Sequence, residues 1–150
     1  MRFDRADSAW NCEYCQSARA AAANLDGVAI GAEAAGAPCP LCRTPLHHAT
    51  AARHRMLGCQ QCHGLLIGMA EFLPVIRQLR LRKRSRADIL DPVCPTELDR
   101  EVRCPHCSKR MHTHRYGGPG NIVIDNCPAC RVNWLDSGEI SRVVAAPGCY

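Results

Sequence analysis

The chain has 150 residues, which is enough for one ordinary domain or for several very small ones. Aromatic residues make up only 5% of it, and with 11 glycines and 10 prolines a single large apolar core is not expected. A formal net charge of +5 leaves a nucleic-acid partner open, and the lack of any apolar run of about 18 residues excludes a transmembrane helix. The polar start of the chain, Met1 to Ser8, lacks the apolar segment of a secretion signal, so we expect a cytoplasmic protein with no membrane contact.

Twelve cysteines are the dominant feature of the composition. Domains of about 40 residues need disulfides or metal ions in addition to a core. A reducing cytoplasm keeps thiols free, which favours metal ligation over disulfides. Ten of the twelve cysteines form C-x2-C pairs, and the five pairs are Cys12/Cys15, Cys39/Cys42, Cys59/Cys62, Cys104/Cys107 and Cys127/Cys130.

The first pair, Cys12 and Cys15, has no earlier pair in the chain and looks like the second half of a metal site. We leave open whether it holds metal as a partial third site, is completed by a second chain, takes part in thiol–disulfide exchange, or remains two reduced thiols. The residues up to 37 are rich in Ala and Gly and are predicted to form a linker, with a short strand at 27–30.

The next two pairs are Cys39/Cys42 and Cys59/Cys62, separated by sixteen residues. Each C-x2-C pair forms a tight turn, the knuckle, that presents two thiolates, so two pairs at this separation predict one tetrahedral Zn(Cys)4 site.

A helix is predicted from Met69 to Arg86, because Phe72, Ile76 and Leu79 recur on one face. Its far end is the densest positive cluster of the chain. That cluster suits either contacts to a nucleic-acid backbone or a solvated helix C-terminus, which favours cations. It consists of Arg77, Arg80, Arg82, Lys83, Arg84 and Arg86.

Residues 87–102 are predicted as a connector, with a short helical turn from Thr96 to Asp99. Cys94 has no partner at pair spacing and is interpreted as a free thiol or as an extra ligand for the N-terminal pair. Cys149 near the C-terminus has the same status.

The last two pairs, Cys104/Cys107 and Cys127/Cys130, are separated by nineteen residues and predict a second Zn(Cys)4 site. Between them, residues 110–116 and 122–124 are predicted strands joined by a Gly-Gly-Pro-Gly turn. A helix is predicted to start at Asp136, with Glu139 completing a capping box, and Trp134 and Leu135 are expected to cover the metal knuckle.

The two four-cysteine segments form an internal repeat. Cys39 matches Cys104, Leu66-Ile67 falls at Trp134-Leu135, and Glu71 falls at Glu139. The first copy has Gly68 where the second has Asp136, so its helix should be more weakly capped.

The second copy, C-P-H-C, then C-P-A-C-R-V-N-W-L-D-S-G-E, resembles the transcription factor IIB-like zinc-finger family over residues 104–145. The resemblance implies a small metal-stabilised α+β fold with two tandem zinc ribbons, each a knuckle, a β-hairpin and a second knuckle followed by a short helix. The expected segments are 1–37 (a partial ribbon and linker), 38–86 (ribbon one and the basic helix), 87–102 (the connector) and 103–147 (ribbon two and its helix).

Two Zn2+ per chain are therefore expected, with rubredoxin-like iron as the alternative, because tetrahedral sulfur sites suit both metals. Four thiolates leave no open coordination position, so we expect no enzyme. Loading both sites lowers the net charge to about +1, which weakens the global-charge argument for nucleic acid. The family name suggests transcription. The alternative is a protein-interaction adaptor that uses Trp134 and the apolar helix ends.

Overall fold

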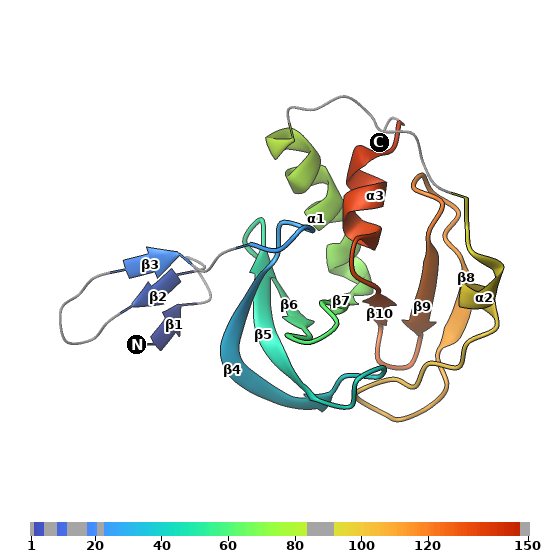
Figure 1. Cartoon of the computed structure of the whole chain (residues 1–150), viewed down its shortest axis with the longest axis horizontal. Helices are drawn as coiled ribbons and strands as arrows, with labels where there is room; N and C mark the ends of the chain where they lie inside the picture. Colours follow the sequence, from blue (N-terminus) through green and yellow to red (C-terminus); the bar gives the residue numbers. More distant parts are fainter. Residues whose placement is uncertain (1, 5–8, 12–17, 21–22, 84–91, 148–150) are drawn as a thin grey trace.

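The computed structural model of the chain describes residues 2–4, 9–11, 18–20, 23–83 and 92–147, and its strands form two antiparallel sheets (Figure 1). The small sheet stands apart at the left of Figure 1 and has the order β1-β2-β3. Its strands are β1 (Arg2–Asp4), β2 (Ala9–Asn11) and β3 (Ala18–Ala20).

The large sheet has seven strands in the order β4-β5-β6-β7-β10-β9-β8. The strands from the first half are β4 (Ala29–Pro38), β5 (Pro45–Ala51), β6 (His54–Gly58) and β7 (Leu65–Gly68). Those from the second half are β8 (His112–Arg115), β9 (Val123–Cys127) and β10 (Val132–Leu135). Both repeats therefore contribute to one sheet.

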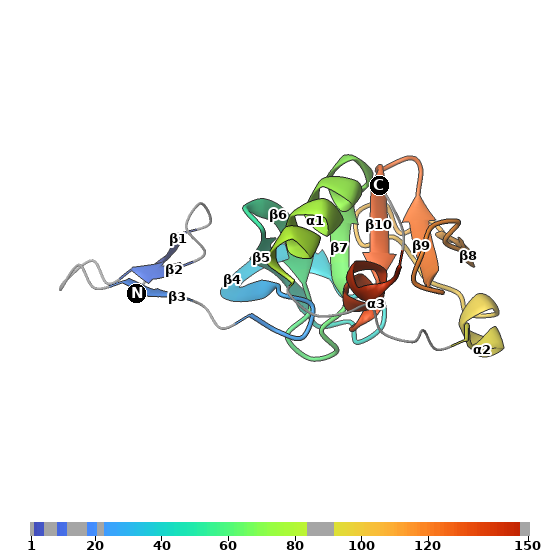
Figure 2. The same ribbon diagram turned by 90° about the horizontal axis from the view of Figure 1, so that it is seen from above.

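Three helices accompany the strands: α1 (Met69–Arg82), α2 (Pro95–Leu98) and α3 (Glu139–Ala145). Seen from above, α1 and α3 lie side by side over the strands, whereas α2 stands at the β8 edge (Figure 2). The predicted class, a small α+β fold with two tandem zinc ribbons, is confirmed.

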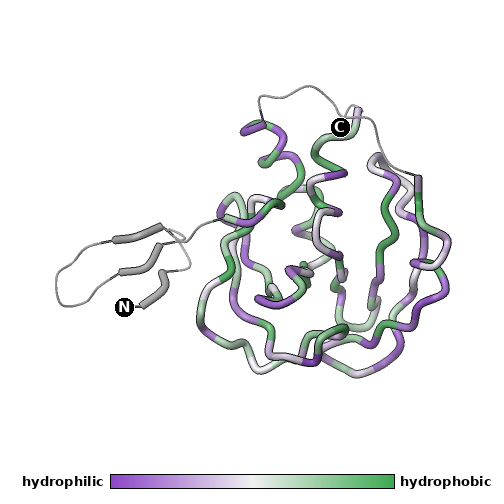
Figure 3. The backbone as a smooth tube through the Cα atoms, viewed as in Figure 1, coloured by the Kyte–Doolittle hydropathy of each residue, from purple (hydrophilic) through white to green (hydrophobic). Residues whose placement is uncertain are grey.

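Side chains of the central strands alternate between two cores. Leu65 and Ile67 of β7 and Leu135 of β10 pack with α1 and α3, whereas Leu66 and Trp134 point to the opposite side, among the cysteines. This period of two is what an extended chain imposes. Figure 3 colours the backbone by hydropathy, and the first part of β9, Val123 and Ile124, is apolar. Leu135 thus packs under the helices. The prediction that it covers the metal knuckle is wrong.

The two repeats meet where β7 pairs with β10. Leu66 pairs with Trp134, its own counterpart in the repeat, and Leu65 pairs with Leu135, the counterpart of Ile67. A pseudo-twofold axis therefore passes between Leu66 and Trp134. The ribbons pack as the subunits of a symmetric dimer do, within one chain.

The second part of the Ala/Gly-rich stretch predicted as a linker forms the edge strand β4. Val28, Ala29 and Ala37 are buried, with Val28 in the core under the helices and Ala37 in the core around the cysteines. The strand predicted at 27–30 is present in part, since β4 begins at Ala29. The linker prediction is wrong for residues 31–37, because alanine-rich composition does not reveal that a neighbouring strand is available to pair with.

The predicted helix start at Asp136 is also wrong, since α3 begins at Glu139. Glu139 Oε2 does accept the backbone N–H of Asp136 at 2.7 Å, which is half of the capping box. The other half comes from Asp26, whose Oδ2 accepts the N–H of Gly138 at 2.8 Å and whose Oδ1 accepts that of Ser141 at 2.9 Å. Helix α1 starts after Gly68 with no side-chain cap, in keeping with the weaker capping expected of it.

Candidate metal centres

The eight paired cysteines of the two ribbons come together in two sets of four. These sets are Cys39, Cys42, Cys59 and Cys62, and Cys104, Cys107, Cys127 and Cys130. Within each set all Sγ atoms lie within 4.8 Å of one another.

The sulfur spacing fits a tetrahedral ion. The Sγ atoms of Cys39 and Cys62 are 3.7 Å apart, and those of Cys107 and Cys127 are 3.6 Å apart. A zinc–sulfur bond of about 2.3 Å places the corners of a tetrahedron roughly 3.8 Å apart. A disulfide would require about 2.05 Å, and all eight thiols are free. The two sites therefore fit two Zn2+ ions.

All four knuckles use the same backbone turn. The residue after the second cysteine is left-handed each time, with φ of 62° at Arg43, 59° at His63, 60° at Ser108 and 55° at Arg131. In the first three, the N–H of that residue donates to the carbonyl of the first cysteine at 2.8–3.0 Å. A left-handed residue with a side chain costs about 1–2 kcal/mol. Binding of a metal ion by the two thiolates of the turn offsets this strain.

The ligands are shielded unequally. The first cysteine of each pair is buried and the second is half-buried. Behind the buried sulfurs lie Leu46, Leu66, Met111 and Trp134. A Cβ built on Gly64 would stand 2.3 Å from Trp134 Cζ2, so the indole packs directly on the chain beside Cys62.

One thiol in each set ionises more readily than its neighbours. Burial alone would raise the pKa of Cys59, but hydrogen bonds from the backbone N–H of Cys62 and the hydroxyl of Thr44 lower it to about 6. The N–H of Lys109 lowers the pKa of Cys107 to about 7, while the hydrogen bond to Cys107 raises the pKa of Cys130 to about 12. Burial raises the pKa of Cys39 and Cys104. A divalent cation therefore displaces protons from the remaining thiols when it binds.

Not every residue singled out in the sequence joins these sets. Cys12, Cys15 and Cys149 lie outside the described residues. Cys94 is exposed, and its Sγ lies 2.9 Å from Thr96 Oγ1, a hydrogen bond that lowers its pKa. Among the residues that the structure describes, the two cysteine sets are the only groups of three or more side chains placed to hold a metal.

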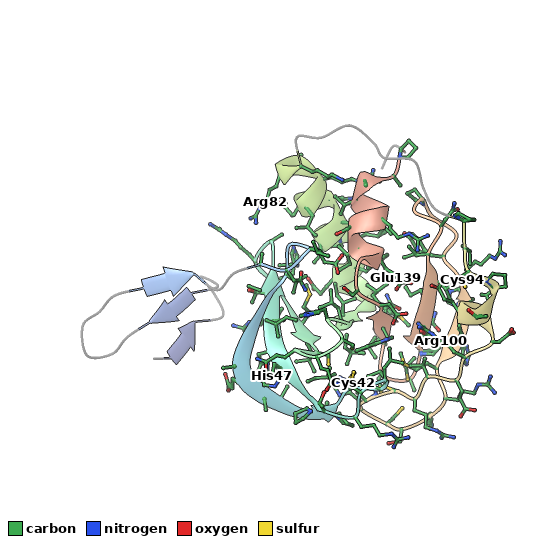
Figure 4. The ribbon with its side chains drawn as sticks, in the orientation of Figure 1. Cys42, His47, Arg82, Cys94, Arg100 and Glu139 are labelled. Atoms are coloured by element: carbon green, nitrogen blue, oxygen red, sulfur yellow. The ribbon has the colours of Figure 1, made fainter. Side chains whose placement is uncertain are left out.

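The predicted basic cluster is divided by the fold. Arg80 Nη2 donates to the carbonyls of Val143 at 2.7 Å and Ala146 at 3.0 Å, so it holds the C-terminus of α3. Arg77 and Arg82 are exposed, and Figure 4 shows Arg82 at the free end of α1. Lys83 is half-buried, and Arg84 and Arg86 lie outside the described residues.

A partly buried ionic network links the connector to the second ribbon. The guanidinium of Arg100, labelled in Figure 4, forms ion pairs with both Asp125 and Asp136. The hydroxyl of Thr113 donates a hydrogen bond to Asp125. Asp125 is 0% exposed, and burial raises its pKa although Thr113 and Arg100 oppose the shift. Sequence reasoning missed this network. Its one signal was an acidic residue directly after the apolar run Ile122 to Ile124.

A shared antiparallel sheet with two tetracysteine centres defines the molecule as a tandem zinc-ribbon protein. Residues 103–146 match the family model of the transcription factor zinc-finger, the zinc ribbon of the transcription factor IIB type. The first ribbon lies outside that match and is recognised by its own cysteine set. Neither the curated proteins nor the solved structures returned a match. Among the described helices, none is long and apolar enough to cross a membrane.

Proposed function

We propose that the protein is a non-enzymatic, cytoplasmic zinc-ribbon module that binds the backbone of nucleic acid, in keeping with a transcription-associated role. The zinc ions serve the fold. Each centre has four cysteine ligands, whereas catalytic zinc keeps one position for water or substrate. The eight free thiols support the proposed cytoplasmic location, because a reducing compartment keeps thiols available for metal.

The observation that carries the nucleic-acid proposal is how the fold distributes charge. Of the nine acidic side chains with described burial, Asp26, Asp125 and Glu139 are buried. Those of Glu33, Asp99, Glu101 and, at 46%, Glu71 are exposed. Ten of the basic side chains are exposed, namely Arg43, Arg53, Arg55, Arg77, Arg82, Arg103, Lys109, Arg110, Arg115 and Arg131. Exposed basic side chains thus outnumber exposed acidic ones among the described residues, and the thiolates that lower the net charge of the loaded protein are buried or half-buried. Such a surface attracts phosphates and releases their counterions.

Binding of a fluorescein-labelled 20-base-pair DNA duplex to the zinc-loaded protein tests this function. The logarithm of the affinity should fall linearly with the logarithm of the salt concentration, with a slope of about −0.9 for each phosphate contact. Fluorescence anisotropy at several salt concentrations measures the slope. A protein that leaves the duplex free at low salt does not have this function.

A protein-interaction adaptor is the second candidate, and the exposure of two leucines favours it. Leu25 is 89% exposed and Leu81 is 80% exposed. Trp134, the other residue considered for such a surface, is 0% exposed and offers none. An adaptor of this kind would bind its partner with little dependence on salt and would lose affinity in the variant Leu81→Ser.

A further inference from the structure

A groove of about 320 Å³ lies between the two metal centres, at the end of the molecule where the knuckles meet. The first knuckle of each ribbon forms one wall, so Cys39-Pro40 faces its counterpart Cys104-Pro105. The remaining lining residues are Pro38, Arg43, Glu101, Arg103 and Ser108. Three prolines and the hydrogen-bonded knuckles make the walls rigid, so a ligand would not have to order them.

Two arginines from different ribbons converge on this groove. Arg43 is exposed, and its guanidinium makes no hydrogen bond or ion pair with any described residue. Arg103 pairs with Glu101 at 2.8 Å, but the side chains are 66% and 47% exposed. Arg103 Nη1 also donates to the Ser108 carbonyl at 3.4 Å. Exposed ion pairs are weak, so Arg103 can exchange Glu101 for a phosphate while it keeps this longer hydrogen bond.

The loaded metal sites oppose an anion here, because each Zn(Cys)4 centre carries a formal charge of about −2. The two sulfurs that line the groove are shielded, however, since Cys39 is 1% and Cys104 is 2% exposed. The arginine side chains are exposed at the rim and meet an incoming anion first. Screening by water and salt is stronger for an exposed group than for a buried one, so the nearest charges decide the local potential.

We propose that this groove binds a phosphate of the nucleic-acid backbone between Arg43 and Arg103, with Ser108 as a hydroxyl donor. This assignment rests on the proposed function and locates it at the joint between the ribbons. Both arginines can present two N–H groups to one phosphate, a geometry that suits guanidinium better than ammonium. Glu101 acts as a competitor that the phosphate displaces from Arg103.

Three charge variants of the zinc-loaded protein test the groove with the same labelled duplex. Arg43→Gln should weaken binding roughly five- to tenfold at 0.1 M salt and make the salt slope shallower by about 0.9. Glu101→Gln should tighten binding at least twofold, because it removes the carboxylate that competes with the phosphate for Arg103. Arg115→Gln is the matched control. It removes one charge of the general basic surface at the end of β8, where Arg115 pairs with Val123 rather than with the knuckle end of β9, and should weaken binding by a clearly smaller factor than Arg43→Gln does.

The outcomes separate this site from the general function. If Arg43→Gln and Glu101→Gln bind the duplex as wild type does while the salt slope persists, the groove assignment is wrong and nucleic-acid binding stands. If wild type fails to bind the duplex, the function itself is wrong. Zinc content must remain at two ions per chain in Arg43→Gln, because loss of an ion would mean that Arg43 serves the metal site. Inorganic phosphate that binds in an Arg43-dependent manner without affecting the duplex would point to a free anion and overturn the proposal.

Discussion

Asp26 joins parts of the chain that are more than 110 residues apart. Asn24 Oδ1 accepts the N–H groups of Asp26 at 3.0 Å and Val28 at 3.1 Å, which forms a tight turn. This turn presents the Asp26 carboxylate to the first N–H groups of α3. Two residues of the stretch predicted as a linker thus provide the helix cap that the local sequence was expected to supply.

Removal of this cap should destabilise the fold without affecting the metal sites. We expect Asp26→Ala to lower the free energy of unfolding by about 1–2 kcal/mol, because it leaves the N–H groups of Gly138 and Ser141 without their acceptor. Urea denaturation of the zinc-loaded protein measures the change. Asp26→Asn keeps one acceptor oxygen and should lose less. Equal losses in the two variants would show that the negative charge, and not the hydrogen bonds, provides the stabilisation.

Glu139 should make stability depend on pH. Burial, and next the charge of Asp136, raise its pKa from 4.5 to about 8. Because the pKa in the folded state is the higher one, the folded protein favours the protonated carboxyl. The contribution of the Glu139 carboxyl to the free energy of unfolding is complete below pH 4.5 and is lost as the pH rises through 8.

Glu139→Gln keeps an oxygen for the N–H of Asp136 but cannot ionise. Between pH 6 and pH 9 the unfolding free energy of wild type should therefore fall relative to that of the variant, by about 2–3 kcal/mol. Denaturation curves of both proteins across this range provide the comparison. A constant difference across the range would mean that Glu139 does not titrate there.

At the level of elements, the decisive contact is the pairing of β7 with β10. Strand β7 is only four residues long and β10 is equally short. Each would be an edge strand if its ribbon stood alone, with Leu66 or Trp134 uncovered. Pairing about the pseudo-twofold axis removes both edges and buries both side chains. The helices reinforce the joint, because Arg80 of α1 holds the last carbonyls of α3.

Gly64 tests the packing of Trp134 at this joint. The variant Gly64→Ala places a methyl group 2.3 Å from Trp134 Cζ2, so the ring or the strand must move. Overpacking of this kind costs about 1–3 kcal/mol. Gly117→Ala is a suitable control, because nothing lies within 4 Å of its new methyl group. Urea midpoints of the two variants should differ accordingly, and matching midpoints would mean that the indole has room to move.

For the molecule as a whole, one sheet carries two metal centres, so the ribbons should not unfold separately. Metal binding contributes on the order of 10 kcal/mol per structural zinc site, which is comparable to the whole stability of a small domain. The sheet also leaves neither half with a complete core, since the cluster under the helices draws on both repeats.

Loss of the second site should therefore affect the first half too. In the double variant Cys104→Ser/Cys107→Ser we expect zinc content to fall from two ions to one or none and the cooperative thermal transition to be lost. A strong chelator added to wild type should abolish the far-ultraviolet circular dichroism of both ribbons in one step. A first ribbon that keeps its zinc and a cooperative transition in the double variant would contradict this view.

Much of this architecture follows from local pattern alone. The spacing of C-x2-C pairs predicts two four-sulfur centres, because the knuckle is a short turn whose geometry depends on few neighbours. The period of Phe72, Ile76 and Leu79 likewise predicts α1. The capping of α3 and the role of residues 23–38 were not predictable in this way. Asp26 and Ala29 become part of the fold only through contacts with distant segments, and composition does not encode those contacts.

The sequence by itself determined the two four-sulfur sites, the repeat and helix α1, since each shows in a local pattern of residues. Only the tertiary structure decided that the repeats share one sheet about Leu66 and Trp134. It also decided that Arg80 binds α3 and that Arg43 and Arg103 meet across a groove. The physical reason is that strand pairing and charge placement depend on which surfaces meet in space, and many distant pairings satisfy the same local pattern.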